Sequence, residues 1–300
     1  MIDALKTASR RRCGTVLAAA LFGLAAAVPA PAAANNVTIV AAENIYGDVA
    51  AQIGGGHVAV TSLISNPSQD PHLFEATPSA VRAIADARIV ILNGADYDPW
   101  LEKLIKSAPN PQRAVVSAAA VMGRKPGDNP HLWYDPATLP RVAEAIAATL
   151  TAADPAHAAD YAANLATLTA SFKRIDARVA ALGARYKGVP VTATEPVFGP
   201  MAQAIGLTMR NERFQLAMMN DTEPTAHDLA EIERDLKEKR VKLLIYNSQV
   251  SELMSTRLRA LAAASKIPVV PVTETLPAGQ HVQDWLMSEL DALDKALAGQ

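Results

Sequence analysis

The sequence has a single cysteine, Cys13, and it lies in the N-terminal segment 1–34. We expect that segment to be removed during export, for reasons given below, so the remaining chain has neither a disulfide nor a thiolate. Any metal site in that chain must therefore use nitrogen and oxygen donors. The chain from position 35 to position 300 is long enough to bury a core without covalent cross-links.

The chain also lacks an excess of basic residues and a second long apolar run. Its formal net charge is −2, and the charge becomes −5 once segment 1–34, with four basic side chains and one acid, is set aside. This charge argues against nucleic-acid binding, which favours a concentrated basic face. After position 34 no apolar run approaches the roughly 20 residues that cross a bilayer. We therefore expect no transmembrane segment in the mature protein.

The N-terminus has the order of features that is typical of a secretory signal peptide. A positive start with Lys6 and Arg10 to Arg12 precedes an apolar run from Thr15 to Val28, and small residues follow through Ala34. The apolar run is too short to span a bilayer. We predict cleavage near Ala34 and a periplasmic location. Cys13 precedes the apolar run, so it cannot accept a lipid at the cleavage point.

Short apolar runs alternate with helical patterns along the rest of the chain. This alternation predicts an α/β fold with mostly parallel sheets in two βα lobes. The predicted strands are Val37–Ala41, His57–Ile64, Ile89–Asn93, Val115–Ser117, Val189–Thr194, Leu207–Arg210, Val241–Tyr246 and Val269–Val272. The predicted helices are Glu43–Ile53, Pro78–Asp86, Asp98–Ser107, Thr138–Thr151, Val197–Ile205, Thr225–Lys239, Ser251–Ala264 and Gln283–Leu297.

A long helix is predicted between the two lobes. Asp154 and Pro155 form a helix start signal, and no glycine or proline follows before Leu182. Apolar residues recur there at spacings of three and four, which predicts a helix of roughly 28 residues, or about 42 Å. We interpret it as a rigid strut in a chain organised as residues 1–34, signal peptide; 35–153, N-terminal lobe; 154–186, interdomain helix; and 187–300, C-terminal lobe.

Four polar residues stand at the ends of predicted strands or in the loops that follow them. His72 follows Pro71 and His131 follows Pro130, while Glu195 and Glu274 each end an apolar strand pattern. Ligands of open parallel sheets bind beyond the carboxyl ends of the strands. Two of these residues come from each lobe, so all four could face a crevice between the lobes.

Two imidazoles and two carboxylates suit a first-row divalent cation, namely zinc, manganese or iron(II). The prolines before the two histidines restrict the backbone next to each donor. Other interpretations stay open, since either histidine could be a solvated loop residue, Glu195 could cap a helix and Glu274 could pair with a lysine. The remaining histidines are expected to be ordinary surface or helix residues: His57, His157, His227 and His281.

At this point the chain resembles the metal-binding receptors of bacterial ABC importers for zinc and manganese, the cluster A-I or zinc-uptake type. The matching segments span the mature chain and occur in the family's order. They are DPHLFEATPS (Asp70–Ser79), NGADYDPWLEKL (Asn93–Leu104), NPHLWYDP (Asn129–Pro136), TEPVFGPMAQAIGL (Thr194–Leu207) and VTETLPAG (Val272–Gly279).

The resemblance implies a C-clamp of two βα lobes with metal bound between them, and a membrane permease with its ATPase as partners. The first two ligand positions of the family fall on His72 and His131. The third, histidine in many zinc receptors and glutamate in many manganese receptors, falls on Glu195, and the fourth, usually aspartate, falls on Glu274. Two oxygen ligands favour manganese or iron(II) relatively, but affinity generally rises toward zinc, so the metal stays open. We expect a monomer.

Two other functions compete with this interpretation. A secreted metal-dependent hydrolase would need an open coordination position for water and a general base, which Glu274 could supply if it were not a ligand. A receptor for an organic iron chelate would need arginines and aromatics in its cleft, yet aromatics make up only 5% of the chain. We therefore expect capture and delivery of a metal ion without catalysis.

Overall fold

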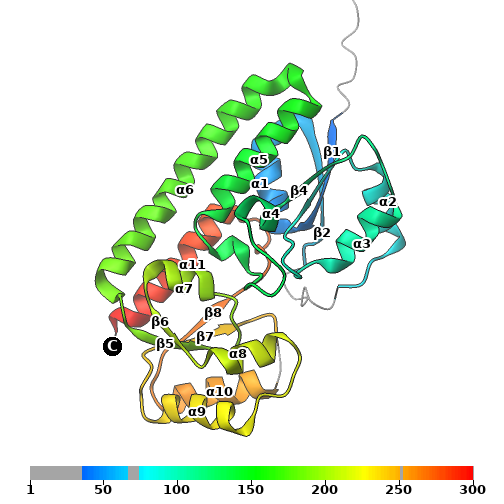
Figure 1. Ribbon diagram of the computed structural model, residues 1–300. Coiled ribbons are helices and arrows are strands. Elements are labelled where there is room, and N and C mark those ends of the chain that lie inside the picture. Colours follow the sequence, from blue (N-terminus) through cyan, green and yellow to red (C-terminus); the bar gives the residue numbers. More distant parts are fainter. Residues whose placement is uncertain (1–35, 67–73, 251–252, 300) are drawn as a thin grey trace, which may run out of the picture. The chain divides into compact units, whose positions relative to one another are not determined.

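The computed structural model describes residues 36–66, 74–250 and 253–299, and these residues pack as one unit. Two four-stranded sheets organise this part of the chain, in the orders β2-β1-β3-β4 and β6-β5-β7-β8 (Figure 1). Every strand pair is parallel. This arrangement confirms the predicted α/β fold with two βα lobes.

The N-terminal sheet is covered by helices on both faces, because successive strand residues point to opposite sides. Ile39 and Ile91 pack with α1 and α5, whereas Val40 and Val90 pack with α2 and α3. The elements of this lobe are β1 (Val37–Glu43), α1 (Asn44–Gly54), β2 (Val58–Ile64), α2 (Pro78–Asp86), β3 (Ile89–Leu92), α3 (Pro99–Ser107), β4 (Ala114–Ser117), α4 (Ala118–Met122) and α5 (Thr138–Ala153).

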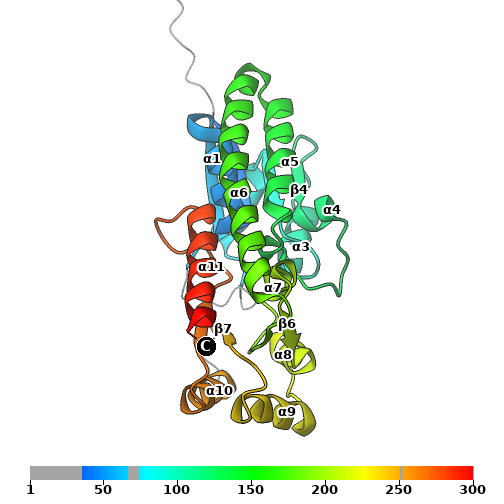
Figure 2. The same cartoon turned by 90° about the vertical axis from the view of Figure 1, so that its left-hand side faces the viewer.

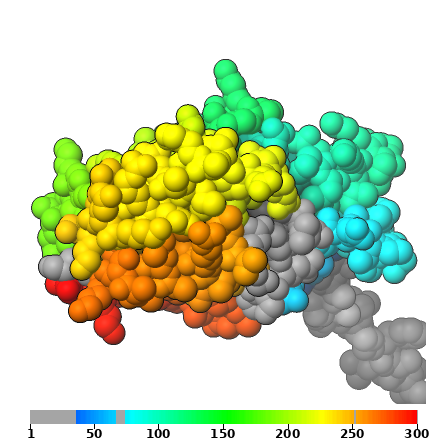
Figure 3. All heavy atoms as spheres, turned by 90° about the horizontal axis from the view of Figure 1, so that it is seen from below, coloured from blue at the N-terminus to red at the C-terminus, as the bar shows by residue number. Residues whose placement is uncertain are grey.

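The C-terminal sheet repeats the same principle. Leu244 packs with α8, α9 and α10, whereas its neighbour Ile245 faces the core shared by α6, α7 and α11. Figure 3 shows α9 and α10 side by side on the outer surface of this lobe. The elements are β5 (Pro190–Ala193), α7 (Gly199–Ile205), β6 (Thr208–Arg210), α8 (Glu212–Met219), α9 (Ala226–Lys237), β7 (Leu244–Asn247), α10 (Leu253–Ala264), β8 (Val269–Val272) and α11 (Val282–Ala298).

The predicted long helix is present as α6 (Ala158–Tyr186), which has 29 residues. It begins later than predicted, because the residues after the start signal form a 3₁₀ turn, Pro155–His157. It also continues through Gly183, where a side chain would be crowded: a Cβ atom on this residue would lie 3.0 Å from the carbonyl oxygen of Ile205, closer than nearly all such contacts. The glycine therefore permits close packing of α7 rather than ending the helix.

Helix α6 contacts both lobes. It packs against α1 and α5 along its N-terminal half and against α7 and α11 along its C-terminal half (Figure 2). Its buried stripe belongs to a single apolar core that continues into the inner faces of both sheets. The guanidinium of Arg178 adds ion pairs to Asp291 and Asp294 of α11, at 2.7 Å and 2.9 Å. The two lobes are thus joined by a common core and not only by a linker.

Two short helices were not predicted. Helix α4 is only five residues long, and its signals are local: the Ser117 hydroxyl accepts a hydrogen bond from the Ala120 amide, and Gly123 ends the helix in a left-handed conformation. Helix α8 has no side-chain N-cap, because the preceding Asn211 is itself left-handed with φ of 62°.

Within the described ranges, no helix combines the length and the apolar character needed to cross a membrane.

The shared core predicts a large stability cost for a truncation in α6. Phe172 is 3% exposed within that core. Replacing Phe172 with alanine should lower the free energy of unfolding by about 3–5 kcal/mol, because it removes buried apolar area and leaves a cavity. Urea denaturation followed by circular dichroism measures this change. The exposed neighbour gives the control, since Lys173→Ala should change the value by less than about 0.5 kcal/mol; equal effects would contradict the shared core.

Candidate metal centre

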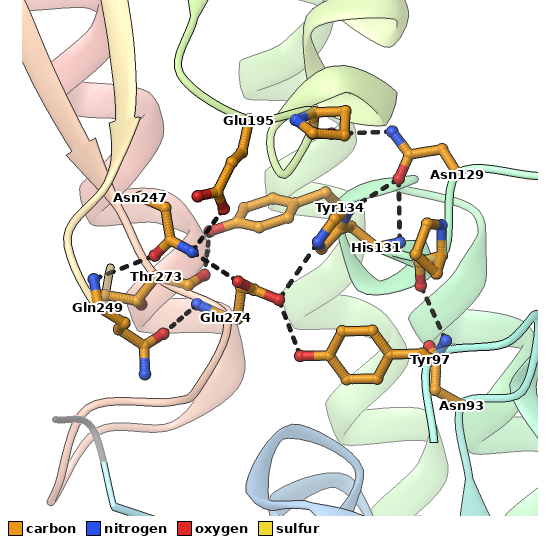
Figure 4. Close-up of polar contacts among 12 residues, drawn as sticks. Asn93, Tyr97, Asn129, His131, Tyr134, Glu195, Asn247, Gln249, Thr273 and Glu274 are labelled. Atoms are coloured by element: carbon orange, nitrogen blue, oxygen red, sulfur yellow. Dashed lines mark hydrogen bonds and ion pairs between the residues drawn. The ribbon is translucent and has the colours of Figure 1, made fainter. Parts of the chain in front are cut away.

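Three adjacent strands of the C-terminal sheet present polar side chains at the same edge. Glu195 follows β5, Asn247 ends β7 and Glu274 follows β8. Because β7 lies between β5 and β8 and all three run parallel, Asn247 lies between the two glutamates. Figure 4 shows the three side chains turned toward one another. Strand order therefore brings together residues that are far apart in the sequence.

The amide of Asn247 bridges the two carboxylates. Its Nδ2 donates to Glu195 Oε2 at 2.9 Å and to Glu274 Oε1 at 2.6 Å. Its Oδ1 accepts the backbone N–H of Gln249 at 3.0 Å. The Gln249 side chain in turn accepts the backbone N–H groups of Glu274 and Thr275. Both the carboxylates and the loop that carries Glu274 are thus held by amide groups.

The N-terminal lobe contributes two side chains to the same group. His131 Nε2 lies 3.2 Å from Glu274 Oε2, and the hydroxyl of Tyr97 donates to the same oxygen at 2.9 Å. His131 and Glu274 are fully buried, and Glu195 is 7% exposed. An imidazole and two carboxylates from different lobes therefore meet away from solvent (Figure 4).

Asn129 determines which nitrogen of His131 faces the carboxylate. Its Oδ1 accepts hydrogen bonds from His131 Nδ1 at 2.8 Å and from the His131 backbone N–H at 3.0 Å, while its Nδ2 donates to Pro196 O at 2.8 Å. An amide oxygen can only accept, so Nδ1 carries the hydrogen. Nε2 is then the ring nitrogen that faces Glu274, and it is the nitrogen that would bind a metal ion.

Tyr97 is presented by a left-handed turn. Gly94, Ala95 and Asp96 have φ values of 75°, 53° and 62°. Each non-glycine residue in this region costs on the order of 1–3 kcal/mol, and such strain concentrates at functional sites. The carboxylate of Asp98 supports the turn by accepting the backbone N–H groups of Asn93 and Gly94, each at 2.7 Å.

Burial dominates the electrostatics of the N-terminal side. It raises the pKa of Asp98 to about 6, and it raises the pKa of Glu43 well above the usual value, with a further contribution from the negative charge of Asp98. The pKa of Tyr97 is likewise raised, first by burial and then by Glu274 and Glu43. Tyr97 is therefore a neutral hydrogen-bond donor at neutral pH, and not a phenolate.

A second polar link joins the lobes beside the site. The hydroxyl of Tyr134 lies 2.7 Å from Thr273 O and 2.8 Å from Glu289 Oε2. The Tyr134 hydroxyl is the donor to both oxygens, which share its single hydrogen. Burial raises the pKa of Glu289 to about 8, although the hydrogen bond from Tyr134 acts in the opposite direction. Tyr134 thus links Glu289 of α11 to the backbone of Thr273, next to Glu274.

Of the four residues proposed as ligands from the sequence, His131, Glu195 and Glu274 lie together. His72 is outside the described residues. The positions of Asn247 and Gln249 and the roles of Tyr97 and Asn129 were not predicted from the sequence. Only knowledge of the strand order could have identified Asn247, because it ends an apolar strand with no distinguishing motif.

The histidines set aside from the sequence take part in other contacts. His57 stacks on His157 with ring centroids 3.8 Å apart, and His281 Nδ1 contacts Asp48 at 2.8 Å. His227 lies near Asp228 and Glu231, within the spacing that a metal ion would require. The Asp228 carboxylate, however, already accepts Arg213 at 2.6 Å and the Thr225 hydroxyl at 2.6 Å. Arg213 also places a positive charge there, so this group is a poor cation site.

Comparison with known proteins places the chain among metal-binding receptors. Residues 39–296 match the profile of the family described as zinc-uptake complex component A, periplasmic. The manganese-binding lipoprotein MntA of Halalkalibacterium halodurans is 31% identical over 133 residues, which is 43% of this chain and 44% of that protein. The metal ABC transporter substrate-binding lipoprotein FimA of Streptococcus parasanguinis is 24% identical over 86% of this chain and 88% of its own.

The fold is also that of a solved receptor. The structure of the periplasmic zinc-binding protein TroA from Treponema pallidum superposes with a TM-score of 0.74, at 18% identity, over 87% of this chain and 99% of that chain. The alignment with MntA spans less than half of that relative's length, whereas those with FimA and TroA span nearly all of theirs. The names of these relatives state manganese for MntA, an unspecified metal for FimA and zinc for TroA.

The raised pKa of Glu289 predicts a pH dependence of stability. Its folded pKa lies above the ordinary value of 4.5, so the stabilising contribution is complete below about pH 4.5 and is lost as the pH rises through about 8. The free energy of unfolding should fall by up to a few kcal/mol over this range, since each unit of pKa difference is worth about 1.4 kcal/mol. Urea midpoints at pH 5, 6.5 and 8.5 measure it. Glu289→Gln, which stays neutral, should flatten the dependence of the unfolding free energy on pH. An equally steep dependence in this variant would contradict the role of Glu289.

Proposed function

This chain belongs to the family of zinc-uptake complex component A, periplasmic, and from that membership we propose that it captures a divalent transition metal outside the cytoplasm and delivers it to a membrane ABC permease. The observation that carries the proposal is the meeting of His131 with Glu274 across the lobes, at 3.2 Å, beside Glu195. Donors from two lobes in one buried group suit a cargo that is held between them.

We propose that the metal ligands are His72, His131, Glu195 and Glu274. The donor set fits a divalent cation, because carboxylates can supply negative charge and His131 Nε2 lies 3.2 Å from one of them. Zinc or manganese is the proposed cargo, and iron(II) also suits two nitrogens and two oxygens. The ion would cancel charge that is otherwise costly to bury.

The remaining assignments follow from this role. We propose that residues 1–34 are a signal peptide cleaved near Ala34, that residues 35–153 and 187–300 are the two lobes, and that residues 154–186 are the helix between them. The mature protein would act as a periplasmic monomer whose partners are the permease and its ATPase. The protein's own contribution is to bind, orient and desolvate the cation, so no catalytic step is proposed.

The competing function, a secreted metal-dependent hydrolase, would require Glu274 to act as a general base beside a metal-bound water. Both oxygens of Glu274 instead accept hydrogen bonds, from Asn247 and from Tyr97. A carboxylate held in this way is suited to ligation more than to proton abstraction. The family membership also favours the receptor.

Removing single ligands tests the proposal directly. His131→Ala, Glu195→Ala and Glu274→Ala should each lower zinc or manganese affinity by at least about 100-fold, because even groups that only orient ligands contribute 10- to 100-fold. His72→Ala should behave in the same way. Elemental analysis after loading with mixed metals and gel filtration gives the stoichiometry. His227→Ala, at an exposed histidine, is the matched control and should still bind one ion per chain. If all four ligand variants also retain one ion, the metal site lies elsewhere.

Protons should compete with the metal. An imidazole ligand must be neutral to bind, so protonation of His131 Nε2 displaces the cation. We expect affinity to fall steadily as the pH is lowered from 7.5 to 5.5, the range in which histidines acquire charge. Titration calorimetry in buffers of different ionisation enthalpy measures both the affinity and the protons released. Affinity that is constant over this range, with no proton release, would contradict ligation by histidine.

A further inference from the structure

Asn247 occupies a unique place between the two carboxylates among the described residues. An amide nitrogen carries two hydrogens. Here one is donated to Glu195 Oε2 at 2.9 Å and the other to Glu274 Oε1 at 2.6 Å. One donor group therefore holds one oxygen of each carboxylate, and it does so because β7 runs between the strands that carry them.

The orientation of this amide is fixed. Its Oδ1 accepts the backbone N–H of Gln249 at 3.0 Å. Turning the group round would set its oxygen against two carboxylate oxygens and its N–H₂ against the N–H of Gln249, so three favourable contacts would become repulsive. Asn247 is 1% exposed, so water cannot replace the lost hydrogen bonds. The amide is thus a rigid element of the site.

The consequence is clearest for Glu274. Its Oε1 points to Asn247, whereas its Oε2 lies 3.2 Å from His131 Nε2. A cation bound by His131 therefore meets Oε2 of this carboxylate. To bind through both oxygens, the Glu274 carboxylate would have to turn its Oε1 from Asn247 toward the ion. This turn would lengthen or break the 2.6 Å hydrogen bond and leave a buried N–H unsatisfied, which is unfavourable.

We infer that Asn247 is a specificity-determining residue, which restricts Glu195 and Glu274 to one metal-binding oxygen each and so favours a four-coordinate cation. The inference rests on the proposed function. Zinc is almost always four-coordinate in protein sites that are built entirely from side chains. Manganese favours octahedral, oxygen-rich sites, and larger cations such as calcium often use bidentate carboxylates. Asn247 therefore selects for zinc relative to manganese in a shell whose donor types alone do not decide between them.

Two substitutions test the inference. Asn247→Leu removes both donors with little change in volume, and Asn247→Ser keeps one O–H, so the serine variant tests the idea if the leucine variant does not fold. Each should lower the ratio of zinc to manganese affinity by about tenfold, the scale of one hydrogen bond to a charged group. Competition titrations with a chromophoric chelator measure both affinities. The probe ions are zinc and manganese alone.

Cobalt(II) reports the coordination number independently of affinity. The wild-type cobalt complex should have the strong visible absorption of a four-coordinate ion, and the Asn247 variants should absorb more weakly as the second carboxylate oxygen binds. A residue that merely supports the fold would not change this spectrum. The control is Thr192→Val, which removes a buried hydroxyl of β5 that donates to Asn211 Oδ1 at 2.8 Å. It should lower stability and leave the metal ratio and the spectrum unchanged.

The outcomes separate this inference from the proposed function. The wild-type protein should bind one ion per chain. If it does, and the Asn247 variants keep the same zinc-to-manganese affinity ratio and the same cobalt spectrum, only the role of Asn247 is overturned. The same follows if Thr192→Val changes the ratio as much as the Asn247 variants do, because the effect then reflects a loosened sheet. Wild-type protein that binds none of the three ions in stoichiometric amount overturns both.

Discussion

The burial of two carboxylates in the seam between the lobes is the constraint on which this structure depends. A buried charge is tolerated only when it is paired or hydrogen-bonded. Glu195 and Glu274 meet this requirement through the amide of Asn247, and Glu274 also through the hydroxyl of Tyr97. Neither Asn247 nor Tyr97 contributes a positive charge. A divalent cation, which is the proposed cargo, would place one in this seam.

The same constraint requires that the two lobes keep a constant separation. Tyr97 of one lobe donates to Glu274 of the other over 2.9 Å, so a larger separation of the lobes would break this hydrogen bond. Helix α6 and the apolar core that it shares with both lobes provide that rigidity. Polar links add to it: Asn44 forms two hydrogen bonds with the backbone of Leu276, at 2.7 Å and 2.9 Å. Rigid packing thus serves the site by limiting the cost of ordering the donors when an ion binds.

Much of the fold could be predicted because it depends on local patterns. All eight strands of the described residues overlap the predicted ones, and the long helix was identified from its apolar spacing and from the start signal at Asp154. The misses were also local in origin. Helix α4 is too short to show periodicity. Helix α8 begins after the left-handed Asn211, whose side chain does not cap the helix. Gly183 does not end α6, because tertiary packing against Ile205 outweighs its low helix propensity.

The sequence by itself determined the residue types that can hold a cation and the strand ends at which they stand, because backbone alternation and proline placement are properties of neighbouring residues. It also carried the motifs by which the family is identified. Only the tertiary structure decided which of these residues meet. The order of β5, β7 and β8 in the sheet inserts Asn247 between two glutamates, and the packing of one lobe on the other turns His131 toward Glu274. Such contacts arise from the pairing of segments that are distant in the chain, and no local pattern specifies that pairing.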